Sequence, residues 1–228
     1  MSRSRSFSSL VLTLAAVGCG PAPSGGGIPL GQTQQGIATF YDATGAGNCS
    51  FDPSPGDLMV AAMNAPQYAN SAVCGECVKV EGPSGSVVVR IVDQCPDCGT
   101  GHLDLSREAF ALIADPKLGR VNIQWTPVSC AVGGPVAYHF KDHSSQWWTA
   151  IQVRNHRLPI QKMEWGRDGV WHAMERQDYN FFLDDGGVGP SAFRVRITSV
   201  DGQQLEDALP GPLDDQTVNG AAQFEEAK

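Results

Sequence analysis

Residues Val87–Cys98 have the sequence VVVRIVDQCPDC, which combines a β-branched run, an acidic residue and a pair of cysteines. Its β-branched run predicts a short strand, in which alternation places Val87, Val89 and Ile91 on one face. Asp93 ends the strand on the same face, at the rim of an apolar interior. Desolvation at such a rim raises the pKa of a carboxyl group and suits it to proton donation. We therefore expect a β-rich domain with a carboxylate at one edge of its core.

Six of the seven cysteines lie between residues 36 and 131, in two close pairs and two outlying positions. They are Cys49, Cys74, Cys77, Cys95, Cys98 and Cys130. The two pairs are 17 residues apart, a spacing that also occurs in zinc sites. An export signal at the N-terminus instead indicates a compartment in which disulfides persist. We therefore expect three disulfides, no metal and no cofactor, although spacing alone leaves fifteen connectivities open.

The N-terminus has the pattern of an export signal. Residues 1–19 combine a basic start with an apolar stretch too short to span a bilayer, and small residues precede Cys19 as in bacterial lipoproteins. We expect Cys19 to be lipidated and to anchor the protein at the outer membrane. Ordinary cleavage near Ala22, with secretion to the outside, is the alternative. Residues 20–35 are rich in Pro, Gly, Ser and Gln and are expected to form a flexible linker.

The charge balance narrows the class of partner. The 228 residues include 16 Lys and Arg against 24 Asp and Glu, a net charge of −8 that becomes −10 without Arg3 and Arg5 of the leader. Nucleic acid is a poor partner for such a chain, because its binding requires a basic surface that neutralises phosphates. A neutral polymer fits the composition better.

A change in composition divides the chain near residue 131. The six cysteines precede it, and four of the five tryptophans follow it. Short runs bounded by turn residues predict strands at 36–41, 78–80, 87–92 and 121–127, and then at 136–140, 147–154, 160–165, 170–172, 180–183 and 193–200. We therefore predict a mainly β protein. A barrel-like domain spans 36–131, and an antiparallel β-sandwich with a short C-terminal tail spans 132–228.

One helix is expected in the first domain. Ser106 can N-cap a helix over 107–114, which Asp115-Pro116 ends. Its predicted apolar stripe consists of Leu105, Ala109, Leu112 and Ile113. Asp104 directly precedes the cap, where an Asp taken alone complements a helix N-terminus more often than it catalyses.

Alternation along the first strand separates its polar residues. Thr39, Tyr41 and Ala43 fall on one face and Asp42 on the other. If Thr39 and Tyr41 face a groove, Asp42 points away from it.

The order and spacing of these motifs resemble those of bacterial expansins, close relatives of plant expansins. The resemblance covers about 190 residues from Gly36 to Phe224, so it is far more specific than one short motif. In the first domain it rests on Gly36–Tyr41, Cys74–Cys77, Val92–Pro96 and His102–Ser106. In the second domain it rests on Lys141, Ser145–His156, Met163–Trp165 and Asp178–Asn180.

The resemblance implies a fold and a disulfide pattern. The fold is a six-stranded double-psi β-barrel, similar to that of family 45 glycoside hydrolases, joined to an immunoglobulin-like sandwich of carbohydrate-binding module family 63. The implied disulfides are Cys49 with Cys74, Cys77 with Cys130, and Cys95 with Cys98.

The resemblance also implies a function. Expansins loosen cell walls by disturbing noncovalent contacts between cellulose and matrix glycans, without hydrolysis, so the protein is expected not to be an enzyme. The implied partners are cellulose and xyloglucan-type matrix glycans, with peptidoglycan as a further candidate. The implied groove residues are Thr39, Tyr41, Asp93 and Asp104. We expect a monomer that contacts a membrane only through its lipid anchor.

One position argues independently against hydrolysis. Inverting hydrolysis needs a general acid and a general base about 6.5–9.5 Å apart. In the related hydrolases the base faces the groove near the end of the first strand, where this chain has Ala43, with Asp42 one residue out of phase. Asp104 is thus an acid without an evident base. Some bacterial members also carry a groove tyrosine where this chain has Cys95.

Aromatic side chains suit sugars because their π surface stacks on apolar C–H faces while the hydroxyl groups stay hydrated. The resemblance assigns polysaccharide binding to Lys141, Trp147, Trp148 and Tyr179. The alternative is that these tryptophans pack in the core. Alternation would send Trp147 and Trp148 to opposite faces, so both are exposed only if the strand begins with a bulge or a strong twist. Trp165 and Trp171 are expected to pack.

Two other functions remain open. A glycoside hydrolase or lytic transglycosylase of the same barrel fold would cleave cellulose or peptidoglycan. A non-catalytic glycan-binding lipoprotein would need the sandwich alone.

Overall fold

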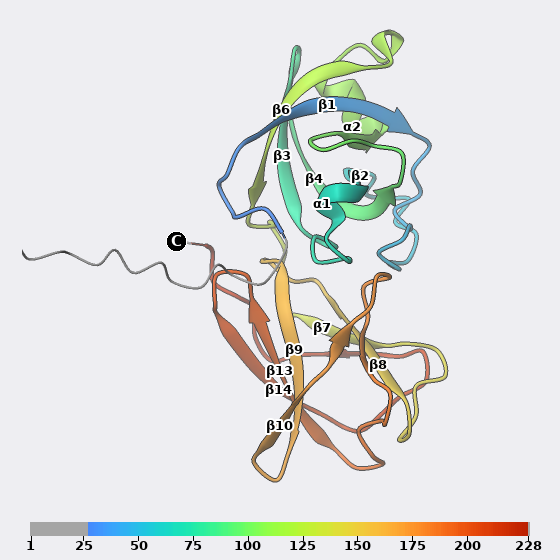
Figure 1. Cartoon of the computed structure of the whole chain (residues 1–228), viewed down its shortest axis with the longest axis vertical. Coiled ribbons are helices and arrows are strands. Elements are labelled where there is room, and N and C mark those ends of the chain that lie inside the picture. Colours follow the sequence, from blue (N-terminus) through green and yellow to red (C-terminus); the bar gives the residue numbers. More distant parts are fainter. Residues whose placement is uncertain (1–26, 228) are drawn as a thin grey trace, which may run out of the picture.

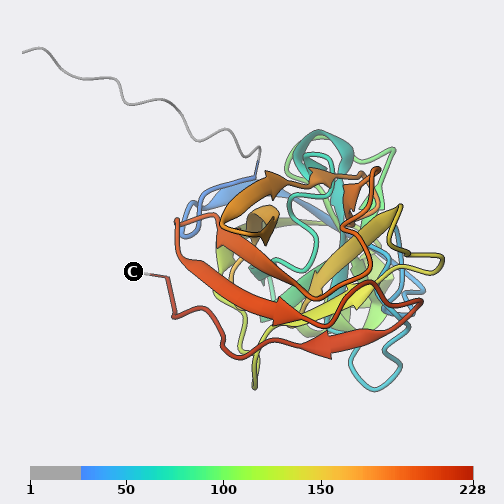
Figure 2. The same ribbon diagram turned by 90° about the horizontal axis from the view of Figure 1, so that it is seen from below.

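The computed structural model describes residues 27–227, in two β-rich domains stacked along the long axis of the molecule (Figure 1). The expected leader, Cys19 and residues 20–26 of the expected linker lie outside the described residues. The rest of that segment joins the fold: Ile28 packs against the barrel core, Leu30 packs against the sandwich core, and the first strand begins at Gln34. In a view along the stack, the strands of the second domain lie in front of the first domain (Figure 2). Among residues 27–227, no helix has the length and apolar character that a membrane crossing needs.

The first domain is a closed barrel of six strands in the order β1-β5-β2-β4-β3-β6. The pairs β1/β5 and β2/β4 are parallel, and the other four pairs are antiparallel. The strands are β1 Gln34–Tyr41, β2 Val60–Asn64, β3 Cys77–Gly82, β4 Gly85–Cys95, β5 Leu103–Ser106 and β6 Val121–Val128. The short helices are α1 Ala65–Tyr68, α2 Arg107–Ile113 and a 3-10 turn at Pro116–Leu118. The barrel predicted from the sequence is confirmed.

Alternation explains how β4 forms the barrel wall. Val87, Val89 and Ile91 are buried in the barrel core, whereas Val88 between them is 47% exposed. The indole of Trp125 fills the same core and donates a 3.0 Å hydrogen bond to the Gly101 carbonyl, so its one polar atom is satisfied.

Three disulfides staple the barrel and its loops. The pairs are Cys49–Cys74, Cys77–Cys130 and Cys95–Cys98, as the resemblance implied. The zinc alternative is excluded at these positions, because a sulfur in a disulfide is not available as a thiolate ligand. Among residues 27–227, no cluster of three or more His, Cys, Asp or Glu side chains could hold a metal ion.

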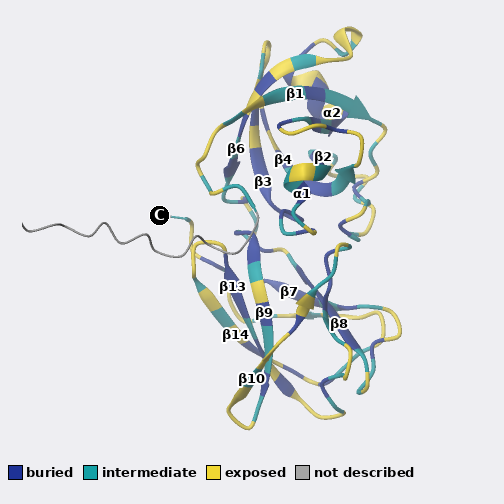
Figure 3. Cartoon of the chain, in the orientation of Figure 1, coloured by how far each residue is buried: buried dark blue, intermediate teal, exposed yellow. Residues whose placement is uncertain are grey.

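The second domain is a sandwich of two antiparallel sheets. One sheet has the order β10-β9-β13-β14 and the other β11-β12-β8-β7-β15. The strands are β7 Ala137–Phe140, β8 Thr149–Arg154, β9 Ile160–Arg167, β10 Val170–Ala173, β11 Glu175–Arg176, β12 Phe182–Asp184, β13 Phe193–Ser199, β14 Gln204–Leu209 and β15 Thr217–Asn219. Both sheets contribute to one apolar core, so β7 and β8 are largely buried, whereas the edge strand β10 is largely exposed (Figure 3).

Some sequence expectations were wrong in detail. The strands β2, β5, β11, β14 and β15 were not anticipated, and β8 begins at Thr149 rather than at Trp147. Leu112 was placed on the buried stripe of the helix but is 53% exposed. Phe110 is buried in its place, because in a helix of seven residues Ala109, Phe110 and Ile113 form the face that packs on the barrel. Ser106 caps this helix as predicted and accepts a hydrogen bond from Ala109 N.

The junction between the domains contains a buried carboxyl group, that of Glu76. A cavity of about 280 Å³ lies between the barrel, the segment Gly27–Leu30 and the sandwich residues Pro159–Gln161, and Glu76 borders it. Glu76 is buried, and its Oε1 atom has no hydrogen-bond partner within residues 27–227. Burial raises the pKa of Glu76 to about 8. The junction therefore favours a neutral Glu76.

Candidate functional site

A row of four residues crosses the barrel wall and brings the predicted groove residues together. Strand pairing places Thr39 of β1 opposite Asp104 of β5, Asp104 opposite Ala62 of β2, and Ala62 opposite Asp93 of β4. Adjacent strands are about 4.8 Å apart, so the two Asp backbones are about 10 Å apart across the small side chain of Ala62. The two carboxylates thus belong to one surface, and only the methyl group of Ala62 on β2 lies between them.

Asp104 is held by its neighbour on β1. The hydroxyl of Thr39 donates a 2.5 Å hydrogen bond to Asp104 Oδ1 and lies 2.9 Å from Nε2 of His102. Since the Thr39 proton goes to the carboxylate, the Nε2–H of His102 is the donor to Thr39. Burial lowers the pKa of His102, which favours this neutral imidazole. The three residues form one chain of hydrogen bonds that ends on a groove carboxylate.

His102 is a site residue that the sequence reasoning did not single out. It lies two positions before Asp104, so alternation places both side chains on the same face of the chain. That signal was available in the sequence.

Tyr41 brings an unpartnered phenol to the same groove. Its hydroxyl is buried and has no hydrogen-bond partner within residues 27–227. Burial raises the pKa of Tyr41, and the nearby charges of Asp93 and Asp104 raise it further. The phenol therefore stays protonated, and its side chain must move before the buried hydroxyl can donate to a bound molecule.

Asp93 is fixed by backbone donors. Its Oδ1 atom accepts hydrogen bonds from the backbone N–H of Asn48 at 2.7 Å and of Gln94 at 2.8 Å. The loop before Asn48 approaches very closely, since a Cβ atom added to Gly47 would lie 2.3 Å from the Asp93 carboxyl carbon. A residue with a side chain at position 47 would displace the carboxylate.

The end of β1 provides no carboxylate that faces the groove. Asp42 is exposed and forms an ion pair with Arg107 at 3.2 Å, at the start of α2. Ala43 follows it, without a titratable group. The prediction that Asp42 points away from Thr39 and Tyr41 agrees with this pairing.

The two adjacent tryptophans of the sandwich lie in a tight turn before β8. Ser145 and Trp148 pair across the turn through a hydrogen bond of 2.7 Å from Ser145 N to Trp148 O. Trp147 at the tip is 72% exposed, and Trp148 is partly exposed. The turn explains how both indoles reach solvent, so the bulge or twist expected within a strand is not needed.

Lys141 and Tyr179 lie beside a shared aromatic ring. The Lys141 ammonium is 5.9 Å from the centre of the Phe181 ring, and the rings of Tyr179 and Phe181 are 5.9 Å apart. Lys141 N donates to Ala150 O of β8, the strand that follows the tryptophan turn. Lys141, Trp147, Trp148 and Tyr179, which we call the aromatic platform, therefore come from segments around one sheet.

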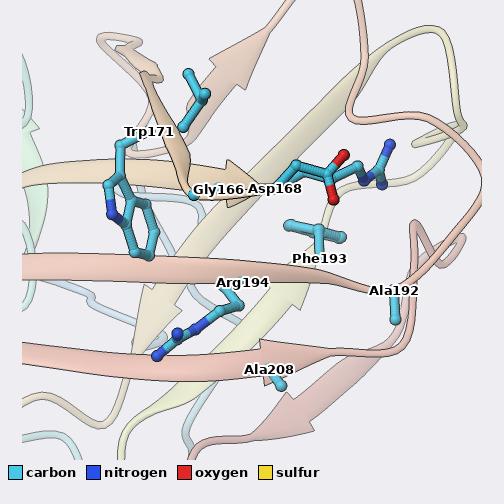
Figure 4. Close-up of a pocket in the computed structure, with 10 residues that line it drawn as sticks. Gly166, Asp168, Trp171, Ala192, Phe193, Arg194 and Ala208 are labelled. Atoms are coloured by element: carbon cyan, nitrogen blue, oxygen red, sulfur yellow. The ribbon is translucent and has the colours of Figure 1, made fainter.

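The remaining tryptophans of the sandwich pack. The indole N–H of Trp165 donates a 2.6 Å hydrogen bond to Asp184, and its ring stacks on His172 at 4.5 Å. Trp171 lies against Gly166 of the neighbouring strand, beside Arg194, at the rim of a shallow pocket (Figure 4). A Cβ atom at Gly166 would lie 2.7 Å from the Trp171 ring, so this indole already has a close neighbour.

The chain is thus a two-domain β protein, in which a closed barrel with a polar groove is joined to a sandwich that exposes tryptophans. A family model described as lytic transglycolase matches residues 33–125, within the barrel. Expansin-YoaJ of Bacillus subtilis (strain 168) is 38% identical over 202 residues, which cover 84% of this chain and 87% of that relative. The chain belongs to the expansin family.

Solved structures agree with this assignment. The crystal structure of the Clavibacter michiganensis expansin without ligand has a TM-score of 0.78 and 33% identity, and the match covers 86% of this chain and 100% of that one. A mutant of the same expansin in complex with cellohexaose gives a TM-score of 0.79 at 32% identity, with the same coverage.

Proposed function

We propose that this protein loosens cell walls by binding cellulose and disrupting noncovalent contacts between glycan chains, without cleaving them. One observation carries the proposal. The groove has Asp104, held by Thr39, but the end of β1 offers Ala43 and an Asp42 that is paired with Arg107. A glycosidic bond beside Asp104 would therefore meet no base at the end of the first strand, where the related hydrolases carry theirs.

The groove residues have complementary hydrogen-bonding roles in this proposal. Asp104 and Asp93 accept hydrogen bonds from glycan hydroxyl groups, and the protonated Tyr41, whose hydroxyl is buried in this structure, donates one once its ring turns into the groove. These bonds replace the bonds that a glucan chain makes to its neighbours in the wall. A hydrogen bond contributes about 1 kcal/mol net, so bonds from the groove can compensate for those that a glucan chain gives up to its neighbours.

The aromatic platform supplies the affinity. The exposed face of Trp147 and the partly exposed Trp148 and Tyr179 offer π surfaces to the C–H faces of glucose units. Lys141 beside Phe181 adds a donor for hydroxyl groups. The relative solved with cellohexaose is consistent with a β-glucan as the ligand.

The finer assignments belong to the same proposal. The partners are cellulose and xyloglucan-type matrix glycans, and the protein acts as an exported monomer. Export follows from the leader, and Cys19 anchors the mature chain through lipid at the outer membrane.

Cellulose binding and weakening of cellulose paper test the proposal together. The protein is expected to sediment with cellulose and to lower the breaking force of wet paper, with the second effect absent in Asp104→Asn. Sedimentation without any weakening would favour a plain glycan-binding protein.

A second candidate has one observation in its favour, the match of the barrel to a lytic transglycolase model. That reaction needs an acid but not a water-activating base, so Asp104 alone could serve it. Release of soluble fragments from peptidoglycan, abolished in Asp104→Asn, would establish this function in place of the proposed one.

A further inference from the structure

Several hydrogen bonds link the two domains, and three of them end on the dipeptide Asn48-Cys49 of the barrel. The side-chain amide of Asn48 donates to the Asp178 carbonyl of the sandwich at 3.1 Å. The Cys49 carbonyl accepts from Gln152 Nε2 at 2.8 Å and from Asn180 Nδ2 at 3.1 Å. Two adjacent barrel residues therefore form three bonds to the sandwich.

These bonds hold the backbone on both sides of Tyr179. Asp178 and Asn180 are its two neighbours in the chain, and each is bonded to the barrel dipeptide. The Asp178 carbonyl accepts a second hydrogen bond, at 3.0 Å, from the hydroxyl of Tyr68 of the barrel. One residue of the aromatic platform is thus fixed to the barrel rather than to the sandwich alone.

Asn48 also forms a hydrogen bond to a carboxylate of the groove. Its backbone N–H donates to Asp93 Oδ1 at 2.7 Å, while its side chain donates to Asp178 and to the Tyr68 hydroxyl at 2.9 Å. Asn48 is therefore bonded through its backbone to a groove carboxylate and through its side chain to the segment that carries Tyr179.

We propose that Asn48 is a positioning residue that fixes the offset between the groove carboxylate Asp93 and the platform residue Tyr179, so that one glucan chain engages both. This inference rests on the proposed binding of β-glucan. Domains within one chain move relative to each other unless their interface prevents it. When two subsites are held at a fixed offset, binding at the second becomes intramolecular and strengthens the binding of any ligand long enough to reach it.

This role predicts an effect that depends on ligand length. An oligosaccharide that occupies the platform alone gains nothing from the offset, whereas one that reaches the groove does. Asn48 is exposed, so its replacement by alanine opens no cavity in the core. The Asp178 carbonyl keeps its bond from Tyr68, so the replacement leaves this acceptor with a donor.

The chain contains a matched control. Asn70 is also an exposed asparagine of the barrel whose side-chain amide donates to a sandwich carbonyl, that of Arg176 at 3.2 Å. It makes no bond to a groove residue. The pair Asn48→Ala and Asn70→Ala therefore separates the loss of one interdomain bond from the loss of the offset.

The experiment measures the affinity of the full chain for cellotriose and cellohexaose by calorimetry. Asn48→Ala is expected to lose about tenfold in affinity for cellohexaose and none for cellotriose, a small part of the avidity that linked sites can supply. Asn48→Asp, which has the same shape but no side-chain donor, should behave alike, and Asn70→Ala should match the wild type. Equal losses for both sugars, or equal behaviour of Asn48→Ala and Asn70→Ala, would overturn the inference.

A measurement without ligand keeps the inference separate from the proposed function. Spin labels are introduced as non-natural amino acids at Leu118 of the barrel and Val170 of the sandwich, which are 60% and 56% exposed. The distance distribution is expected to broaden in Asn48→Ala and to stay narrow in Asn70→Ala. Unchanged distributions in both variants would refute the positioning role. A wild type that binds neither sugar would instead refute the proposed function.

Discussion

Thr39 and Asp104 lie opposite each other on two adjacent parallel strands, and the Thr39 hydroxyl donates a 2.5 Å hydrogen bond to the Asp104 carboxylate. His102 donates to the same hydroxyl, so the orientation of the carboxylate is set by two residues that do not need to touch a ligand. In the proposed mechanism, these two hydrogen bonds orient the Asp104 carboxylate toward a glycan hydroxyl.

Removing the hydroxyl of Thr39 should therefore reduce wall loosening. Thr39→Val has nearly the same shape but cannot donate, and a hydrogen bond to a charged group contributes about 1.5–3 kcal/mol. We expect at least a tenfold loss of wall extension rate, with unchanged sedimentation on cellulose. Thr39→Ser keeps the donor and should retain most activity. Equal activity of the Val and Ser variants would show that the bond is unimportant.

Removing Trp147 should weaken binding to cellulose. The indole is 72% exposed, so its loss affects stacking rather than the core. If the value for base stacking on aromatic side chains transfers to sugars, Trp147→Ala costs about 1–3 kcal/mol of binding free energy. Depletion isotherms on microcrystalline cellulose measure this change. Trp171→Ala, a change to the other sheet, is the control, and an equal loss in both variants would contradict the assignment of the platform.

Because Glu76 is buried, the free energy of unfolding is expected to fall as the pH rises. Burial raises the pKa of Glu76 to about 8, above the ordinary value of 4.5, so the folded protein holds this proton more tightly than the unfolded chain. The stabilisation is complete below pH 4.5 and is lost progressively as the pH rises to about 8. At about 1.4 kcal/mol for each tenfold change in proton affinity, the loss amounts to at most about 5 kcal/mol.

Glu76→Gln tests this linkage because it keeps the neutral shape at every pH. Urea unfolding at pH 5 and pH 9 should show similar stability of the two proteins at the lower pH and greater stability of the variant at the higher pH. The same difference between them at both pH values would show that Glu76 does not titrate in this range.

The disulfides should differ in their contribution to stability. Cys77–Cys130 closes a loop with a sequence separation of 53, and Cys95–Cys98 one of only 3. The loop-entropy model then gives about 4 kcal/mol for the first and about 2 kcal/mol for the second. Double Cys→Ala variants of each pair, compared by urea unfolding, are expected to follow this order. The reverse order would show that native contacts outweigh loop closure.

The sequence was informative where one face of a strand is apolar and the other polar. The alternation of Val87, Val89 and Ile91 located β4. The alternation from Thr39 to Asp42 separated the groove face of β1 from its outer face. The strand β2, with the sequence VAAMN, is buried on both faces, so it has no alternation that could reveal it. The strand β5 has four residues, too few for a periodic signal.

The site was predictable to a similar extent. The carboxylates and the platform residues lie in short motifs, and the position of His102 two residues before Asp104 could have been used. The bonds of Asn48 could not, because Asp93 and Asp178 are brought to it by the closure of the barrel and the docking of the sandwich. The turn at Ser145–Trp148 has no Gly, Pro, Asn or Asp, the residues by which such turns are predicted.

We propose that this protein loosens cell walls without cleaving glycans. The most direct test clamps a strip of plant cell wall under constant load, adds the protein, and records extension while counting reducing ends released in the same sample. Extension that begins on addition, with reducing ends at the level of a buffer control, is the predicted result. Extension that rises only in proportion to reducing ends, with both lost in Asp104→Asn, would contradict the claim and identify the protein as a glycan-cleaving enzyme.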